Sequence, residues 1–200
     1  LQAPESIPAH VEWAPVRERA LSRLAADELL ADQLCFGLAR LKARSRIGRS
    51  MPGTGALQAE LNRRFGHKPT AAQSSAIIEI RQDMAATAPM MRLLQGDVGA
   101  GKTFVAMNAM LQAVESGAQA ALMAPTEILA RQHFETVSRL CPTQCVYLSG
   151  TIKGAARRET LAAIADGTAR RIVGTPTLFP EGVTVPALGL AAIYQQHRFG

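Results

Sequence analysis

Aromatic residues are scarce in this chain, whose 200 residues include six Phe, two Tyr and one Trp. Proteins that hold single-stranded nucleic acid by base stacking need several exposed aromatic side chains, so stacking is not expected to dominate here. The chain also lacks an apolar run long enough to cross a membrane. Leu1–Ser6 has neither the basic start nor the apolar core of a secretory signal. These absences predict a folded soluble protein with no membrane partner.

Cysteine is also rare, with residues only at positions 35, 141 and 145. An odd number without metal-ligand spacing favours free thiols in a reducing compartment, which predicts a cytoplasmic location. Cys141 and Cys145 are close in sequence but flank an expected turn and strand start, so free thiols are favoured over a zinc site. The chain does not begin with Met, which predicts that it is part of a longer protein.

Positive charge is in excess, with a net charge of +6 and an isoelectric point near 9.8. The excess is greatest between residues 40 and 68, where Glu60 is the only acidic residue. The cations of this interval are Arg40, Lys42, Arg44, Arg46, Arg49, Arg63, Arg64 and Lys68. Such a run is either a solvated linker or a contact with a nucleic-acid backbone. The interval precedes a glycine-rich run, described next, that predicts a nucleotide site, and beside such a site the two interpretations are about equally good.

The most informative feature is a glycine-rich run that ends in Lys-Thr. It comprises Gly96, Asp97, Val98, Gly99, Ala100, Gly101, Lys102 and Thr103. This is a G-x-x-x-x-G-K-T phosphate loop, placed between an apolar run and a helical pattern as the motif requires. Backbone N–H groups of such a loop surround a phosphate at the positive end of the following helix. Lys102 is expected to reach the outer phosphates of ATP, and the Thr103 hydroxyl to bind Mg²⁺.

Helices are expected in the first part of the chain. One long helix is predicted from Pro15 to Arg44, where leucines recur mostly at three- to four-residue steps. A Gly- and Pro-rich connection follows from Gly48 to Gly55, and a short helical piece from Leu57 to Phe65. Another helix is predicted from Ala71 to Met84, with Thr70 as its N-cap.

Strands and helices alternate in the second part. Strands are expected at Met91–Leu94, Ala118–Ala124, Val146–Ser149, Arg171–Val173 and Leu188–Ile193. The helices between them are expected at Lys102–Ser116, Glu127–Leu140 and Ala155–Ala165. Alternation at this spacing predicts an α/β fold, a parallel doubly wound sheet with helices on both faces. Ligands of such sheets bind beyond the carboxyl ends of the strands, where the phosphate loop is expected to lie.

Five segments, in the correct order, resemble motifs of the RecG family of bacterial DNA helicases. They are Met90–Thr103 (motif I), Ala121–Ala130 with Gln132-His133 (motif Ia), parts of Leu148–Glu159, Ile172–Thr175 with Leu178-Phe179 (motif Ib), and Gln196–Gly200 (the tail of motif II). Arg23–Leu30 resembles the family's linker helix. The transcription-repair coupling translocase shares the Gly-Asp-Val-Gly core, but Leu-Leu-Gln before this core and Gln-His in motif II favour RecG.

The resemblance implies a superfamily-two motor that uses ATP and Mg²⁺ to drive branched or forked DNA in replication-fork rescue, recombination and repair. Residues 1–68 would be a helical linker segment and residues 69–200 the first of two RecA-like lobes. A wedge domain would lie upstream and the second lobe downstream, and the protein would associate with the bacterial nucleoid. Contacts with the DNA backbone are implied at Pro125, Thr126, Gly150, Thr151, Gly174 and Thr175. Pro176 replaces a histidine that is common in the family.

Two polar residues have more than one interpretation. Gln73 stands where helicases carry a glutamine that recognises adenine, yet Thr70-Ala71-Ala72-Gln73 also fits a helix capping box. The residues alone do not decide, and the position in the family favours the adenine contact, although Pro69 replaces the usual apolar residue. Thr126 is expected either to cap the following helix or to lie beside a DNA phosphate, and the two are compatible.

Motif II departs from the family. It should read Asp-Glu-Gln-His, but this chain has Tyr194-Gln195-Gln196-His197. The aspartate normally holds the water shell of Mg²⁺ and the glutamate polarises the attacking water, which a phenol and an amide do not do. The chain is therefore expected to bind nucleotide and to hydrolyse it slowly, through either a natural loss or a changed stretch of sequence. The alternative is a P-loop nucleotide-binding module that was never a DNA motor.

Overall fold

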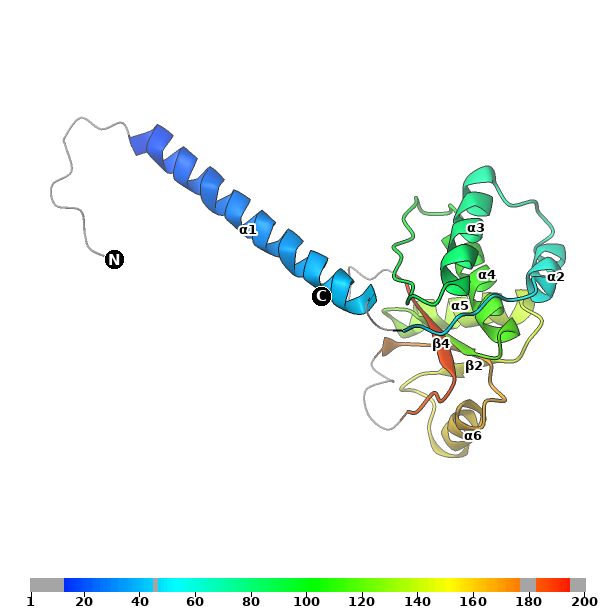
Figure 1. Ribbon diagram of the computed structural model, residues 1–200. Helices are drawn as coiled ribbons and strands as arrows, with labels where there is room; N and C mark the ends of the chain where they lie inside the picture. The colour runs from blue at the N-terminus through cyan, green and yellow to red at the C-terminus, as the bar shows by residue number, and fades with distance from the viewer. Residues whose placement is uncertain (1–12, 45–46, 177–182, 195–200) are drawn as a thin grey trace. The chain divides into compact units, whose positions relative to one another are not determined.

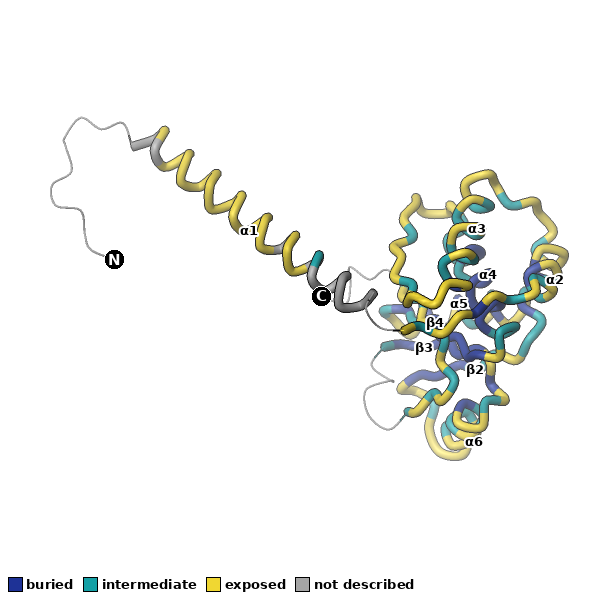
Figure 2. The backbone as a smooth tube through the Cα atoms, viewed as in Figure 1, coloured by how far each residue is buried: buried dark blue, intermediate teal, exposed yellow. Residues whose placement is uncertain are grey.

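The computed structural model describes residues 13–44, 47–176 and 183–194, which fall into two units divided after Arg46 (Figure 1). The first unit contains helix α1 (Trp13–Arg44), close to the helix predicted from Pro15 to Arg44. Its leucines at positions 21, 24, 29, 30 and 34 are each more than half exposed, and Figure 2 shows the described part of this helix as almost entirely exposed. None of the helices in the described residues is long and apolar enough to span a membrane. The expected boundary after residue 68 stays a prediction.

A parallel four-stranded sheet forms the centre of the second unit. The strands are β1 (Gln119–Met123), β2 (Cys145–Leu148), β3 (Arg171–Gly174) and β4 (Leu188–Ile193), in the order β2-β3-β1-β4. The helices are α2 (Ala56–Phe65), α3 (Ala71–Ala85), α4 (Lys102–Glu115), α5 (Glu127–Leu140) and α6 (Gly154–Ala165). Each strand pair is parallel, so the predicted α/β fold class is confirmed, and most element bounds agree with the prediction within two residues.

Side chains alternate between two faces of this sheet, as the pleat of a strand requires. Ala120 and Leu122 of β1 belong to the cluster that includes α4 and α5. Ala121, between them, belongs to the cluster that includes Ile164 of α6. Helices therefore cover both faces, with α6 on the opposite side from α4 and α5 (Figure 1).

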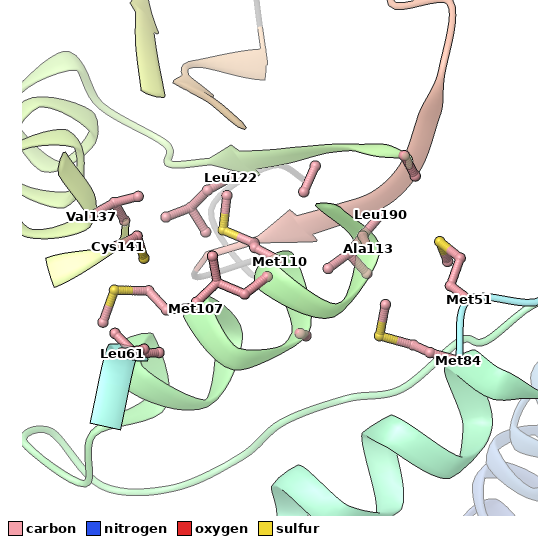
Figure 3. Packing of buried hydrophobic residues seen from close by; sticks show 14 of the residues in the cluster. Met51, Leu61, Met84, Met107, Met110, Ala113, Leu122, Val137, Cys141 and Leu190 are labelled. Carbon is pink, nitrogen blue, oxygen red and sulfur yellow. The ribbon is translucent and has the colours of Figure 1, made fainter. Parts of the chain in front are cut away.

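The larger core lies around helix α4, in which nine residues are buried. Figure 3 shows Met107 and Met110 of α4 among Leu61, Leu122 and Val137, which come from α2, β1 and α5. Helices α2 and α3 pack against α4 from the side away from the sheet. The buried side chains on several sides of α4 hold it in place.

The strand expected at Met91–Leu94 is wrong. These residues have no strand pairing in the described part of the chain, and the side chains of Met91 and Leu93 are 78% and 79% exposed. A strand needs a neighbour to satisfy its backbone N–H and C=O groups, and a short apolar run in a sequence does not show whether such a neighbour is present. The segment nevertheless leads into the phosphate loop, as expected.

The cysteines are free thiols, with Cys35 exposed on α1 and Cys141 buried at the end of α5. Burial raises the pKa of the Cys145 thiol to about 11 and also raises that of Cys141, while the nearby Arg171 guanidinium opposes both shifts. Both thiols therefore remain protonated near neutral pH, which makes them poor nucleophiles and poor metal ligands.

Helix α2 obtains its N-terminal cap from another helix. Its own N-cap, Gly55, provides no side-chain hydrogen bond. The carboxylate of Glu115, at the end of α4, accepts from the backbone N–H of Gly55 at 2.7 Å and also from that of Leu57. Two otherwise unpaired donors of α2 are thereby satisfied by a charged acceptor, which joins α2 to the end of α4.

We expect Glu115→Ala to lower the free energy of unfolding by about 1–3 kcal/mol, because it leaves both N–H donors without this acceptor. Glu115→Gln should lower it less, since the amide oxygen still accepts one bond. The matched control is Glu159→Ala, which removes an exposed carboxylate from α6 and should change stability by less than about 0.5 kcal/mol. Urea denaturation measures all three. Equal stability of the Glu115→Ala and Glu159→Ala proteins would contradict the cap.

Candidate nucleotide and DNA site

The phosphate loop joins the extended segment at Leu94 to the first residue of α4. Gly99 and Gly101 have φ angles of +85° and +78°, in the left-handed region that glycine adopts without strain. Gly101 is also the N-cap of α4, and it provides no side-chain hydrogen bond to the first turn. Unpaired N–H groups and the positive end of the helix dipole therefore coincide with the end of the loop, which is the arrangement that binds a phosphate.

Lys102 folds back over this loop. Its Nζ donates to the carbonyl oxygens of Gly96 and Asp97, both at 2.7 Å. The ammonium group is thus held over the first residues of the loop, within reach of an anion that the loop surrounds. The geometry fits the role predicted for Lys102, and the nucleotide-binding residues of the loop remain sequence-based predictions.

The residues fit ATP better than they fit a complete magnesium site. Thr103 lies in the first turn of α4, beside the loop. Within residues 13–44, 47–176 and 183–194, no cluster of three or more His, Cys, Asp or Glu could hold a metal ion. Mg²⁺ keeps several waters and is commonly bound by one or two protein oxygens together with phosphates. Thr103 and the nucleotide could therefore bind it, without the carboxylate expected at position 194 to hold the water molecules of the metal.

The predicted capping box at the start of α3 is confirmed. The Thr70 hydroxyl accepts from the backbone N–H of Gln73 at 3.2 Å, and the Gln73 side chain accepts from the backbone N–H of Thr70 at 3.0 Å. In addition, Nε2 of Gln73 donates to the carbonyl oxygen of Ala100, in the phosphate loop, at 2.9 Å. This contact between α3 and the loop was not foreseen from the sequence. The adenine contact stays a prediction.

Tyr194 occupies the position of the expected aspartate, directly after β4. Its backbone N–H donates to the carbonyl oxygen of Met123 at 2.8 Å, and its ring meets His133 of α5 with 4.4 Å between ring centroids. The phenol is thus turned towards α5. His133 is 9% exposed, and its Nε2 has no hydrogen-bond partner among the described residues. Burial lowers the pKa of His133, which keeps the imidazole neutral near pH 7. Gln195 lies outside the described residues.

The predicted DNA-contact residues gather at the carboxyl edge of the sheet. Pro125-Thr126 follows β1, Gly150-Thr151 follows β2, and Gly174-Thr175 lies at the end of β3. Gly174 pairs with Met123 of β1 and with Leu148 of β2, so the three turns are neighbours. A Cβ atom on Gly174 would lie 2.3 Å from the carbonyl oxygen of Leu148, which explains the glycine there.

The three threonines of these turns differ in exposure. Thr126 is exposed, and its hydroxyl caps α5 by accepting from the backbone N–H of Leu129 at 3.3 Å, so the predicted cap is confirmed. Thr151 is also exposed, and its backbone N–H donates to the Ser149 hydroxyl at 3.1 Å. Thr175 is buried. The DNA contacts themselves stay predictions.

A groove beside these turns contains Arg131 and Tyr147, two residues that the sequence analysis missed. It has a volume of about 400 Å³ and lies along the first two turns of α5, with Thr151 in its wall. The Arg131 guanidinium lies over the Tyr147 ring, 5.2 Å from its centroid, and the Tyr147 hydroxyl donates to the carbonyl oxygen of Glu127. The spacing of Glu127 and Arg131, four residues apart on a helix, was the available signal that they share one face.

Part of the basic interval is neutralised internally. Glu60 forms ion pairs with both Arg63 and Arg64 on α2. Arg49 donates to the backbone carbonyl oxygen of Ser116 at 3.0 Å. The side chains at positions 40, 42, 44 and 46 lie outside the described residues, so a nucleic-acid contact by this interval stays a prediction.

Comparisons with known proteins give consistent results. Residues 70–190 match the family described as DEAD/DEAH box helicase. The ATP-dependent DNA helicase RecG of Escherichia coli O157:H7 is 44% identical over 184 residues, which cover 90% of this chain and 27% of that protein. RecG of Streptococcus pneumoniae serotype 4 is 52% identical over 132 residues, which cover 66% of this chain and 20% of that protein. The chain thus spans about a quarter of the length of the curated relatives it matches.

A solved structure agrees with these relatives. The structure of RecG bound to a three-way DNA junction matches with a TM-score of 0.79 and 38% sequence identity, covering 92% of this chain and 26% of that one. The family match includes the phosphate loop, strands β1 to β3 and the first residues of β4. The chain belongs to the DEAD/DEAH box helicase family, and over most of its length it is homologous to the ATP-dependent DNA helicases named RecG.

Proposed function

We propose that this chain is the linker segment and the ATP-binding lobe of a RecG-like helicase that remodels branched or forked DNA during fork rescue, recombination and repair. The observation that carries the proposal is the phosphate loop, which ends at the open first turn of the buried helix α4 and has Lys102 folded over it. Similarity to RecG over 90% of the chain supports the choice of motor class. The protein would act in the bacterial cytoplasm, in association with the nucleoid.

ATP would bind with its phosphates in residues 96–103. The Gly99 and Gly101 turns would present backbone N–H groups, Lys102 would exchange its carbonyl partners for the outer phosphates, and Thr103 would hold Mg²⁺. When bound, the metal neutralises phosphate charge and orients the transferred group. Gln73, beside Ala100, belongs to the same site.

DNA would bind through its backbone at the carboxyl edge of the sheet, at Pro125-Thr126, Gly150-Thr151 and Gly174-Thr175. Arg131 is the cation that the groove beside Thr151 offers to a phosphate. The acidic Glu127 and Glu135 in the same groove reduce its attraction for a polyanion. The motor would be completed by a second RecA-like lobe and a wedge domain, the partners of this lobe in the whole protein.

Hydrolysis would be slow in this chain. The Tyr194 ring is packed against His133, so the position that should hold the metal's water shell carries a neutral phenol turned towards α5. This observation also favours the second candidate function, a nucleotide-binding module that does not hydrolyse. The two candidates differ in whether the whole protein moves on DNA, and DNA-stimulated ATPase activity distinguishes them.

Lys102→Ala is expected to abolish tight binding of Mg-ATP without unfolding the chain. The ammonium group contacts only loop carbonyls among the described residues, so its removal leaves the core intact. Isothermal titration calorimetry measures the affinity, and circular dichroism measures the fold. Lys153→Ala, at an exposed lysine before α6, is the control and should bind as the unaltered chain does. Equal affinities of all three proteins would contradict the nucleotide site.

DNA binding by the 200-residue chain is expected to be weak, independent of base sequence and sensitive to salt. Contacts with phosphates release counterions, so affinity for forked DNA should fall by about tenfold or more between 50 and 200 mM salt. Fluorescence anisotropy with two forks of different sequence measures both properties. Thr151→Val, at the carboxyl edge, should weaken binding, whereas Thr184→Val, before β4 at the other edge, should not. A strong base preference or salt-independent affinity would argue against this interface.

Restoring motif II is expected to restore turnover. In a protein that carries both lobes, Tyr194→Asp with Gln195→Glu should raise the DNA-stimulated ATPase rate by at least ~10², the usual contribution of such acid–base groups. Tyr194→Phe with unchanged Gln195 is the control, because it keeps the ring against His133 and adds no carboxylate. A normal helicase rate in the unaltered two-lobe protein would show that these carboxylates are not needed.

A further inference from the structure

The groove beside Thr151, the α5 groove, follows one exposed face of helix α5. The residues that α5 contributes to it recur at helical spacing and are Glu127, Ile128, Arg131, Gln132 and Glu135. All five are exposed. The buried residues of the helix, Ala130, His133 and Val137, lie between them in sequence and pack towards the core. Helix α5 therefore has a second face that the described residues leave uncovered.

The α5 groove carries a net negative charge. Among the described residues, none of the ion pairs involves Glu127, Arg131 or Glu135. The Arg131 guanidinium lies over the Tyr147 ring instead. The carboxylate of Glu127 lies beside the turn after β2, where a Cβ atom on Gly150 would be 3.5 Å from its Oε1. Two carboxylates and one guanidinium favour a cationic partner over a phosphate, although the whole chain has a net charge of +6.

An apolar side chain stands among these charges. Ile128 is 74% exposed and forms part of the groove wall. A single exposed isoleucine is common on a flat surface, but in a groove it offers apolar contact to the segment that fills the groove. The occupant that suits this wall has an apolar side chain next to a lysine or arginine.

The size of the groove indicates a tethered occupant. Residues 127 to 135 span about 12 Å of helix, which is the length of an extended segment of about four residues. A stable contact between separate proteins buries about 1,600 Å² in total, far more than so short a segment supplies. A segment of the same polypeptide needs less contact, because tethering gives it an effective concentration in the millimolar range. The chain matches 27% of the length of a RecG relative, so in a protein of that length most of the polypeptide would lie outside this chain.

We propose that the α5 groove is a docking site for a segment of the same protein from outside residues 1–200, in which a Lys or Arg stands beside an apolar side chain. This inference rests on the proposed function, in which the lobe belongs to a longer helicase. The cation would lie between Glu127 and Glu135, and the apolar side chain would cover Ile128. DNA would be held by the turns beside the groove.

Photo-crosslinking of the whole protein, with forked DNA present, identifies the occupant. Ile128 is replaced by the photoreactive residue p-benzoylphenylalanine, and mass spectrometry maps the product. The expected product is a crosslink within one molecule, to a segment outside residues 1–200 that contains a Lys or Arg. The same replacement at Ala156, exposed on α6, is the control and should not reach that segment. A crosslink to DNA, to a second copy of the protein or within residues 1–200, or no crosslink at all, would overturn the proposal.

Reversal of one charge tests the chemistry of the occupant. In the protein that carries the photoreactive residue at position 128, Glu135→Lys should lower the crosslink yield by about threefold or more, because an attraction becomes a repulsion. Glu159→Lys makes the same change at an exposed site on α6 and should leave the yield unchanged. Both variants should keep the melting temperature of the parent protein. Equal yields in the two variants would overturn the proposal, and so would a crosslinked segment without Lys or Arg.

The proposed function and this inference fail in different ways. Lys102→Ala in the whole protein should abolish tight binding of Mg-ATP and leave the crosslink in place. A whole protein that gives the crosslink but does not bind Mg-ATP tightly would overturn the proposed function alone. A protein that binds Mg-ATP through Lys102 and gives no crosslink within one molecule would overturn the docking site alone.

Discussion

Burial of helix α4 is the constraint on which the second unit depends. The helix packs against α2, α3, β1 and β4, and two of its buried polar side chains donate hydrogen bonds to backbone carbonyl oxygens. Nε2 of Gln112 donates to the carbonyl oxygens of Met51 and Arg81, while Asn108 donates to that of Phe104. A helix held on so many sides cannot shift without breaking core contacts. The phosphate loop, which ends where α4 begins, therefore starts from a rigid base, and Glu115 at the other end of α4 caps α2.

The parallel sheet explains why the expected DNA-contact turns and Tyr194 are close to each other. The turns after β1, β2 and β3 meet at one edge because parallel strands share their carboxyl ends. Tyr194, after β4, donates its backbone N–H to Met123 at the end of β1 and places its ring on His133 of α5. Helix α5 begins at the expected DNA turn, Thr126. Tyr194 stands at the position that should govern hydrolysis, and its ring contacts His133 of α5. The site of hydrolysis is thus in contact with the helix that follows the expected DNA contact at Thr126.

Much of this arrangement could be predicted from the sequence, because periodicity and capping residues are local. The bounds of α5 and the Thr70–Gln73 capping box are examples, and the order of the motifs indicated the family. The failure at Met91–Leu94 has a non-local cause, since a strand depends on a partner that the run itself does not encode. The Gln73–Ala100 bond and the Arg131–Tyr147 contact join residues distant in sequence. Neither follows from spacing alone, and the direction of the Tyr194 ring likewise depends on a contact with His133, which is distant in sequence.

Amide hydrogen exchange in the presence and absence of Mg-ATP tests the central claim, that residues 96–103 bind the triphosphate, most directly. Exchange reports the local opening of individual backbone N–H groups, so it reads the donors that the loop would use. Mg-ATP is expected to give new protection in residues 96–105 and in the first turn of α3, with α6 on the opposite face of the sheet unchanged. No added protection in the loop at saturating nucleotide, or protection confined to other segments, would contradict it.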